Sequence, residues 1–309
     1  MREFELIRHF FSEKSRGPGV REGVGDDAAI LAPSPDHELV MSLDTLVAGV
    51  HFPEDMRAFD IGWRALAVNL SDLAAMGAEP RWCLLGLSLP AVDEPWLKAF
   101  CEGFYTLADR AGITLVGGDL VRAPLSITLQ VTGEVPRGQA LRRAGARAGE
   151  RICIGGVPGE AAAGLVCWQA GRHDGRLAER LARPEPQLAL GKQLRGQASA
   201  CIDISDGLLA DLGHLLHASG ELGADIELNA IPISDALLDW EDAGHRQRAQ
   251  LAGGDDYLLL FTLPSPVPVP DGSSVIGTVS NRPGIRVLDA QGVELDIEVT
   301  GYQHFDGER

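Results

Sequence analysis

Hydrophobic positions along the chain follow both the alternating spacing of strands and the wider spacing of helices. In the first half this pattern predicts strands over residues 37–44, 82–89, 113–116 and 125–135, and helices over residues 60–77 and 94–112. In the second half it predicts strands over residues 151–155, 200–204, 224–228, 255–263 and 274–279, and helices over residues 160–170, 177–197, 208–218 and 234–251. The helix over 177–197 is expected to break at Pro184 and Pro186. Strands and helices mix without strict alternation, so we expect an α+β fold.

Residues 136–150 interrupt this pattern. The segment is rich in glycine, alanine and arginine and has no hydrophobic period, which is typical of a connection between domains. It separates two halves of comparable length, and 309 residues are enough for two cores. We therefore expect an N-terminal domain over residues 1–137 and a C-terminal domain over residues 138–309.

The charge balance and the cysteine pattern narrow the class of protein. The formal net charge of −17 argues against a nucleic-acid partner or an anionic membrane surface, because both require a positive field. The start of the chain lacks the apolar run of a signal peptide, and no later stretch is long enough to span a membrane. The five cysteines stand in apolar contexts without zinc-site spacing, so we expect reduced packing residues of a cytoplasmic protein.

Aspartates stand beside glycines, serines or apolar runs in six short segments. These segments are Gly25-Asp26-Asp27, Ser42-Leu43-Asp44, Ser71-Asp72, Gly117-Gly118-Asp119, Asp203-Ile204-Ser205-Asp206 and Gly253-Gly254-Asp255-Asp256. Carboxylate oxygens suit Mg²⁺, which usually binds between one or two carboxylates and substrate phosphates. Glycines let backbone N–H groups approach those phosphates. The alternative for each single aspartate is a helix N-cap or a turn residue, and Asp206 before an apolar helix fits that alternative well.

Side chains near these segments extend the candidate site. Ser42 and Asp44 alternate to the same strand face, and Asp72 faces the same way as Asn69 on the helix. Ser205 could bind a phosphate through its hydroxyl and its backbone. Neither a P-loop nor a Rossmann glycine fingerprint is present, and no Ser-His-Asp or Cys-His constellation is evident.

Two further candidates lie outside the acidic segments. His51 stands in the loop after Asp44, and a lone loop histidine is more often incidental. Arg142 and Arg143 could clamp a polyphosphate bidentately, or could be solvated charges of the connector.

Several motifs, taken together and in order, resemble the thiamine-monophosphate kinase family. They are GDDAA, SLDTLVAGVHF, NLSDLAAMGA, LVGGD, IDISDGL, GGDDY and, near the end, GYQHF. This family belongs to a superfamily that includes aminoimidazole ribonucleotide synthetase and selenophosphate synthetase. The resemblance spans Gly25 to Phe305. It implies two α/β-layered domains of the aminoimidazole ribonucleotide synthetase type, a homodimer joined through the N-terminal sheets, and ATP-dependent conversion of thiamine monophosphate to thiamine diphosphate.

The resemblance also implies roles for individual residues. The positions that match Mg²⁺ ligands of the family are Asp27, Ser42, Asp44, Asp72, Asp119, Asp203 and, for a further ion, Asp206. The positions that match nucleotide contacts are Gly118, Asp119, Arg143 and Ser205, and those that match thiamine contacts are His51, Asp255 and Tyr302. This chain departs from the family in two places, because Asp255 and Leu258 stand where glutamates are frequent.

The chemistry of the acceptor agrees with this reading. A phosphate monoester is largely ionised at neutral pH because its second pKa is about 6, so no general base is needed. Several Mg²⁺ ions would offset the repulsion between donor and acceptor phosphates, and we expect direct in-line transfer without a phosphoenzyme or a catalytic side chain. The alternatives are a sister ATP-dependent synthetase, a metal-dependent phosphohydrolase, and a silent metal-binding dimerisation module.

Overall fold

The computed structural model describes residues 3–12 and 14–297, and the chain divides into two compact units. Unit 1 comprises residues 1–73 and 78–140, and unit 2 comprises residues 74–77 and 141–309. Both units combine a mainly antiparallel sheet with helices, which confirms the expected α+β class. None of the helices within the described residues is long and apolar enough to cross a membrane.

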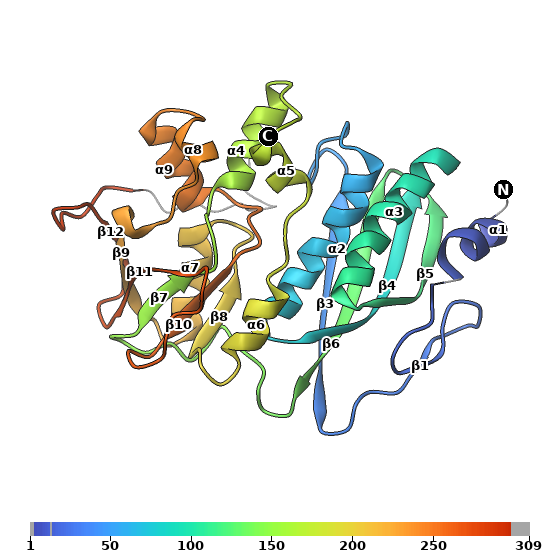
Figure 1. Ribbon diagram of the computed structural model, residues 1–309, viewed down its shortest axis with the longest axis horizontal. Helices are drawn as coiled ribbons and strands as arrows, with labels where there is room; N and C mark the ends of the chain where they lie inside the picture. The colour runs from blue at the N-terminus through green and yellow to red at the C-terminus, as the bar shows by residue number, and fades with distance from the viewer. Residues whose placement is uncertain (1–2, 13, 298–309) are drawn as a thin grey trace. The chain divides into compact units, whose positions relative to one another are not determined.

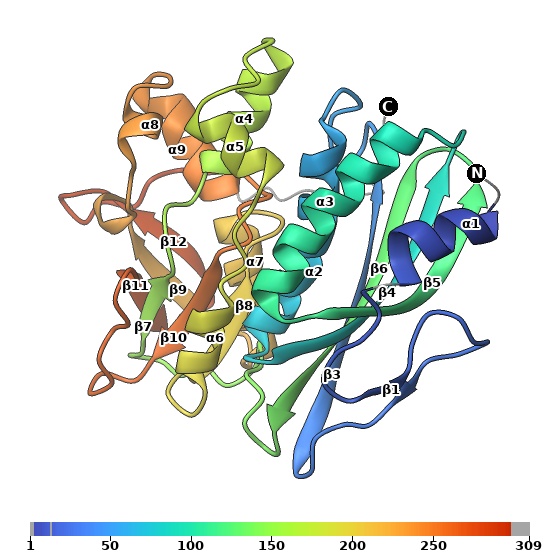
Figure 2. The same ribbon diagram turned by 45° about the vertical axis from the view of Figure 1, so that its right-hand side comes forward.

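Unit 1 is built on a four-stranded sheet in the order β3-β6-β4-β5. Its elements are α1 (Glu3–Ile7), η1 (Arg8–Ser12), β1 (Val20–Glu22), β2 (Ile30–Leu31), β3 (His37–Val47), α2 (Ala58–Ala75), β4 (Glu79–Leu89), α3 (Glu94–Ala111), β5 (Thr114–Arg122) and β6 (Ser126–Pro136). The strands pair antiparallel except for β4 and β5, which run parallel. Helices α2 and α3 lie side by side over one face of this sheet (Figures 1 and 2).

Glycines allow α2 and α3 to pack closely against each other. A Cβ at Gly62 would lie 2.1 Å from the carbonyl oxygen of Phe100, and one at Gly103 would lie 1.8 Å from that of Phe59. Any larger side chain at either position would push the helices apart. This close packing fixes α2 over the sheet, and α2 carries two of the candidate site residues, Asn69 and Asp72.

Unit 2 is built on a six-stranded sheet in the order β12-β9-β11-β7-β10-β8. Its elements are β7 (Arg151–Ile154), α4 (Glu160–Gln169), α5 (Arg176–Ala182), α6 (Leu188–Leu194), β8 (Ala200–Asp203), α7 (Leu208–Ala218), β9 (Gly223–Glu227), η2 (Leu228–Ala230), α8 (Asp235–Leu238), α9 (Ala243–Ala252), β10 (Leu259–Leu263), β11 (Ser274–Ser280) and β12 (Gly284–Leu288). Along β10, Leu260 belongs to a core that includes α7, whereas Leu259 and Phe261 belong to a core that includes Leu194 of α6. The continuous apolar run of this strand therefore reflects burial on both faces.

The structure corrects several element boundaries. Strand β3 continues three residues beyond Asp44, so this aspartate lies within the strand rather than at its end. Strand β5 runs from Thr114 to Arg122, so the glycine pair and Asp119 also lie within a strand. The helix expected over 234–251 is two helices, capped by the side chains of Ser234 and Asp242. The predicted break near Pro184 is confirmed between α5 and α6.

Candidate metal and nucleotide site

A polar cluster in unit 1 joins β3 to α2. The hydroxyl of Ser42 donates to Oδ2 of Asp72 at 2.5 Å, and the backbone N–H of Asp44 donates to Oδ1 of Asn69 at 3.1 Å. The Asn69 amide is itself fixed, because its Nδ2 donates to the carbonyl of Ala65 at 2.9 Å. These contacts confirm that Ser42 and Asp44 share a strand face and that Asn69 and Asp72 point the same way from the helix.

The electrostatics of this cluster favour a bound cation. Burial, together with the smaller effect of the nearby Asp72 charge, raises the pKa of Asp44 to about 6. Two carboxylates this close resist simultaneous ionisation unless a positive charge lies between or beside them. The donor set consists of carboxylate and hydroxyl oxygens, which suits a hard ion such as Mg²⁺. The cluster can therefore hold such an ion through Ser42, Asp44 and Asp72.

Gly118 and Asp119 lie elsewhere in the same sheet. Gly118 has φ of +157° and a Cβ there would meet the carbonyl oxygen of Leu85 at 2.0 Å, so only glycine fits. Asp119 is exposed and lies opposite Gly86 of β4 in the strand register, whereas Asp44 lies opposite Leu129 of β6. Gly118 and Asp119 line a small pocket of about 50 Å³ whose other walls are Ile7, Phe11, Val24, Leu85, Leu87, Leu115, Gly117 and Leu120. The strand ladder thus places Asp119 apart from the cluster around Asp44.

Two other predicted site residues of unit 1 have local partners. Asp27 is exposed, and its backbone N–H donates to Oδ1 of Asp26 at 2.8 Å. His51 folds back on the end of β3, where its Nδ1 accepts from the backbone N–H of Val47 at 3.0 Å. Because Nδ1 acts as an acceptor, the neutral ring carries its proton on Nε2. This contact gives the loop histidine a defined orientation.

In unit 2 the candidate residues follow β8. Asp203 is the buried last residue of that strand and pairs with Leu259. The next turn is loop 205–207, whose three backbone N–H groups donate to Oδ2 of Asp211 at 3.0, 3.0 and 3.2 Å. Burial raises the pKa of Asp211 to about 6 against the opposing effect of these hydrogen bonds.

These contacts change two expectations about the loop. The backbone N–H of Ser205 donates to Asp211, so the hydroxyl rather than the N–H is the group of Ser205 left for the predicted phosphate contact. The N-cap of α7 is Gly207, without a side-chain cap, so the helix-cap reading of Asp206 is wrong. Sequence reasoning missed Asp211, although an acidic residue in the first turn of a helix is a recognised signal for such a contact.

Asp255 lies in a backbone segment that is hydrogen-bonded to loop 205–207. Its N–H donates to the carbonyl of Ser205 at 2.9 Å, and its Oδ1 accepts from the hydroxyl of Tyr257 at 3.1 Å. Asp255 and Tyr257 have φ of +69° and +52°, which is rare for residues other than glycine. Such conformations concentrate at functional sites, where the surroundings hold the strain. Tyr257 is a second contact that sequence reasoning missed.

Arg143 lies in the segment predicted to connect the two domains. The side chain of Arg143 is in an exposed part of the connector, and its carbonyl accepts from the hydroxyl of Ser219 at 3.3 Å. Tyr302 lies outside the described residues. All five cysteines are buried thiols, as expected for packing residues.

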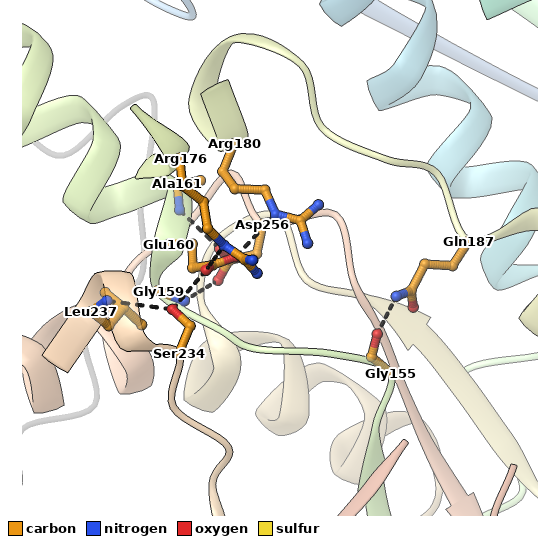
Figure 3. A network of polar contacts seen from close by, with 10 residues as sticks. All are labelled: Gly155, Gly159, Glu160, Ala161, Arg176, Arg180, Gln187, Ser234, Leu237 and Asp256. Atoms are coloured by element: carbon orange, nitrogen blue, oxygen red, sulfur yellow. Dashed lines mark hydrogen bonds and ion pairs between the residues drawn. The ribbon is translucent and has the colours of Figure 1, made fainter. Parts of the chain in front are cut away.

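Polar contacts around Asp256 and the buried carboxylate of Glu160 support the segment that carries Asp255. Figure 3 shows Asp256 at the start of α4, where its carboxylate accepts from the backbone N–H groups of Gly159 and Ala161 at 2.6 and 3.2 Å. The residue between them, Glu160, accepts from Nε of Arg176 and Nε of Arg180 at 2.7 and 2.9 Å. Burial raises the pKa of Asp256 to about 7 despite the two backbone donors. These contacts anchor the chain directly after Asp255.

Comparisons with known proteins show the family of this chain. A family model described as AIR synthase related protein, N-terminal domain, matches residues 25–135. Thiamine-monophosphate kinase of Salmonella typhimurium is 47% identical over 269 residues, which cover 85% of this chain and 82% of the relative. The crystal structure of thiamine-monophosphate kinase from Stenotrophomonas maltophilia K279a is 43% identical, with a TM-score of 0.86 over 93% of this chain and 96% of that chain.

A further solved structure contains ligands. AaThiL complexed with AMPPCP and TMP is 28% identical to this chain, with a TM-score of 0.80 over 99% of both chains. Fold and sequence therefore agree over most of the chain's length. This chain belongs to the thiamine-monophosphate kinase family.

Proposed function

We propose that this protein transfers the γ-phosphoryl group of ATP to the phosphate of thiamine monophosphate, giving thiamine diphosphate and ADP. The observation that carries the proposal is the 47% identity over 85% of the chain to a thiamine-monophosphate kinase. The likeness to AaThiL, whose structure holds AMPPCP and TMP, supports the same pair of substrates. The reaction forms one P–O bond to the acceptor and breaks the bond between the β–γ bridging oxygen and the γ-phosphorus.

Several Mg²⁺ ions are part of this proposal. The oxygen donors at Ser42, Asp44 and Asp72 fit such an ion, and the raised pKa of Asp44 reflects a cluster that a cation would stabilise. Further ligands are assigned to Asp27, Asp119, Asp203 and Asp206. When bound, the ions would neutralise phosphate charge and so reduce the repulsion between donor and acceptor.

The protein's own residues bind and orient the two substrates. We assign Gly118, Asp119, Arg143 and Ser205 to the nucleotide, and His51, Asp255 and Tyr302 to the thiamine substrate. No side chain is assigned as a general base, because the acceptor oxygen is already ionised at neutral pH. Direct in-line transfer should invert the configuration of a chiral γ-phosphorus, whereas a phosphoenzyme would retain it.

A homodimer joined through the N-terminal sheets is the assembly we propose. On the face of β3 turned away from α2, Leu39, Met41 and Leu43 are 48, 64 and 58% exposed. Leu43 pairs with Gln130 of β6, which in turn pairs with Leu84 of β4, so a second exposed leucine lies on this face beyond one polar residue. Three large apolar side chains exposed along one strand face are typical of a protein interface.

The experiment that tests the proposal is ³¹P NMR of the purified protein with Mg-ATP, with and without thiamine monophosphate. A new pair of diphosphate doublets, beyond those of ADP and dependent on the acceptor, is the expected result. Free phosphate in both samples would instead identify a phosphohydrolase. No change in either sample would point to a sister substrate or to a silent metal-binding module.

A further inference from the structure

One acidic side chain that the proposed function leaves without a role organises loop 205–207. Asp211 lies in the first turns of α7 and is 3% exposed. A single oxygen, Oδ2, accepts from the N–H groups of Ser205, Asp206 and Gly207 at 3.0, 3.0 and 3.2 Å. These are three successive residues of the loop that carries two of the proposed ligands.

Three successive N–H groups that converge on one point form a concave site that attracts anions. In many phosphate-binding loops a phosphate oxygen occupies that position. In this protein a carboxylate oxygen of the chain itself occupies it, at distances of ordinary hydrogen bonds. The positive potential of the loop backbone is therefore already compensated, and the loop is better suited to hold cations than bare phosphate.

The opposite side of the loop is held by other contacts. The carbonyl of Ile204 accepts from the N–H of Tyr257 at 2.8 Å, and that of Ser205 accepts from the N–H of Asp255 at 2.9 Å. A Cβ at Gly254 would lie 2.4 Å from the Ser205 carbonyl oxygen, which shows how tightly the two segments pack. Loss of Asp211 would release only the N–H side and would leave the pairing with Asp255 in place.

We propose that Asp211 is a positioning residue: its carboxylate occupies the anion-binding concavity of loop 205–207 and thereby directs Ser205 and Asp206 toward a metal-bound nucleotide. This inference rests on the proposed function of Ser205 and Asp206. The carboxylates of Asp206 and Asp211 and a ring nitrogen of His214 also lie within 4.8 Å of one another. A metal ion held directly by Asp211 is therefore the competing reading.

The test compares Asp211→Ala and Asp211→Asn with the wild-type protein. The amide oxygen of asparagine can still accept from the loop, whereas alanine leaves three N–H groups without their partner. We expect Asp211→Ala to raise both the KM for Mg-ATP and the half-saturating Mg²⁺ concentration about 10-fold or more, in the range typical of residues that support metal ligands. The KM for thiamine monophosphate should change less than about twofold, because loss of one substrate's binding appears in that substrate's KM.

Two further measurements separate positioning from a structural role and from direct ligation. Formate should enter the space left in Asp211→Ala and restore the Mg-ATP KM, while Asp211→Asn should stay within about threefold of the wild-type value. If Asp211 bound the ion directly, asparagine would lose as much Mg²⁺ affinity as alanine, and that result would overturn the proposal. An unchanged Mg-ATP KM in Asp211→Ala would overturn it as well.

The matched control is Asp242→Ala. Asp242 also accepts from two backbone N–H groups, those of Gly244 and His245 at 2.8 and 3.1 Å, but at the exposed start of α9. This variant should keep wild-type kinetic constants. Calorimetric titration with Mg-AMPPCP measures the nucleotide affinity of each variant without turnover. A wild-type protein that makes no thiamine diphosphate would therefore refute the proposed function, while an Asp211→Ala protein with unchanged affinity would refute this inference separately.

Discussion

Substitution of Glu160 by glutamine tests the energetics of the ionic network in Figure 3. The Glu160 side chain is 2% exposed and accepts from Arg176, Arg180 and Ser234 at 2.7, 2.9 and 2.7 Å. Glutamine has nearly the same shape, but its amide nitrogen would face donors instead of accepting from them. The change therefore removes one charge and at least one hydrogen bond without opening a cavity.

The size of the effect follows from the exposure of the partners. Breaking a fully buried ion pair costs about 3–5 kcal/mol, because the remaining charge is left without a partner. The Arg176 and Arg180 side chains are 55% and 34% exposed, so water can solvate both after the substitution. We therefore expect Glu160→Gln to lower the free energy of unfolding of unit 2 by about 2–3 kcal/mol, below the fully buried case.

The pH dependence has a defined sign. Burial alone would raise the pKa of Glu160, but the hydrogen bonds from Arg176 and Ser234 and the charge of Arg180 outweigh burial and lower it. A carboxyl with a lowered pKa stabilises the fold above its unfolded-state pKa of about 4.3, and this contribution is lost as the pH falls through the folded-state pKa. The difference between wild type and Glu160→Gln should be constant from pH 8 to 6 and should shrink below about pH 4.5.

Urea unfolding, monitored by tryptophan fluorescence, measures this difference in the free energy of unfolding. Trp168 lies in the same helix and reports on the region. The matched control is Glu179→Gln, which breaks the more exposed pair with Arg183 and should cost less than about 0.5 kcal/mol. Circular dichroism recorded on the same samples checks whether the two units unfold together. A loss below about 0.5 kcal/mol in Glu160→Gln, or a difference that grows as the pH falls, would refute the reasoning.

Three further predictions address the proposed activity and assembly. Asp44→Asn should lower kcat/KM about 100-fold or more through weakened metal binding, and a near-normal steady-state rate would remove Asp44 from the site. His51→Ala should raise the KM for thiamine monophosphate with little change in kcat, whereas an unchanged KM would make His51 an ordinary loop residue. Met41→Glu should convert the dimer to a monomer in light scattering, because a charge is placed in an apolar interface, and an unchanged mass would exclude that face.

Side-chain spacing predicted which candidate residues of unit 1 point the same way. Alternation along a strand correctly put Ser42 and Asp44 on one face, and helical spacing correctly put Asn69 and Asp72 on another. Both predictions depend only on the period with which side chains repeat along one strand or one helix. Which strand face meets which helix face depends on tertiary packing, and the hydrogen bonds between them could not be read from either pattern alone.

The errors arose where tertiary contacts override local signals. The glycine pair before Asp119 was expected at the end of a strand, but Gly118 adopts φ of +157° within β5, which pairs with β4 as far as Arg122. The backbone of Ser205 was expected to be available to phosphate, but Asp211 occupies it from the following helix. Local sequence indicates that these glycine and serine positions are special, without indicating what their neighbours in space will be.

Transfer of labelled phosphate is the most direct test of the central claim. The protein would be incubated with Mg²⁺, thiamine monophosphate and ATP that carries ¹⁸O on the non-bridging γ-oxygens. The masses of the products would be determined by mass spectrometry. The account predicts thiamine diphosphate with the full label in its terminal phosphoryl group, formed together with unlabelled ADP. Labelled inorganic phosphate with unchanged thiamine monophosphate would contradict it.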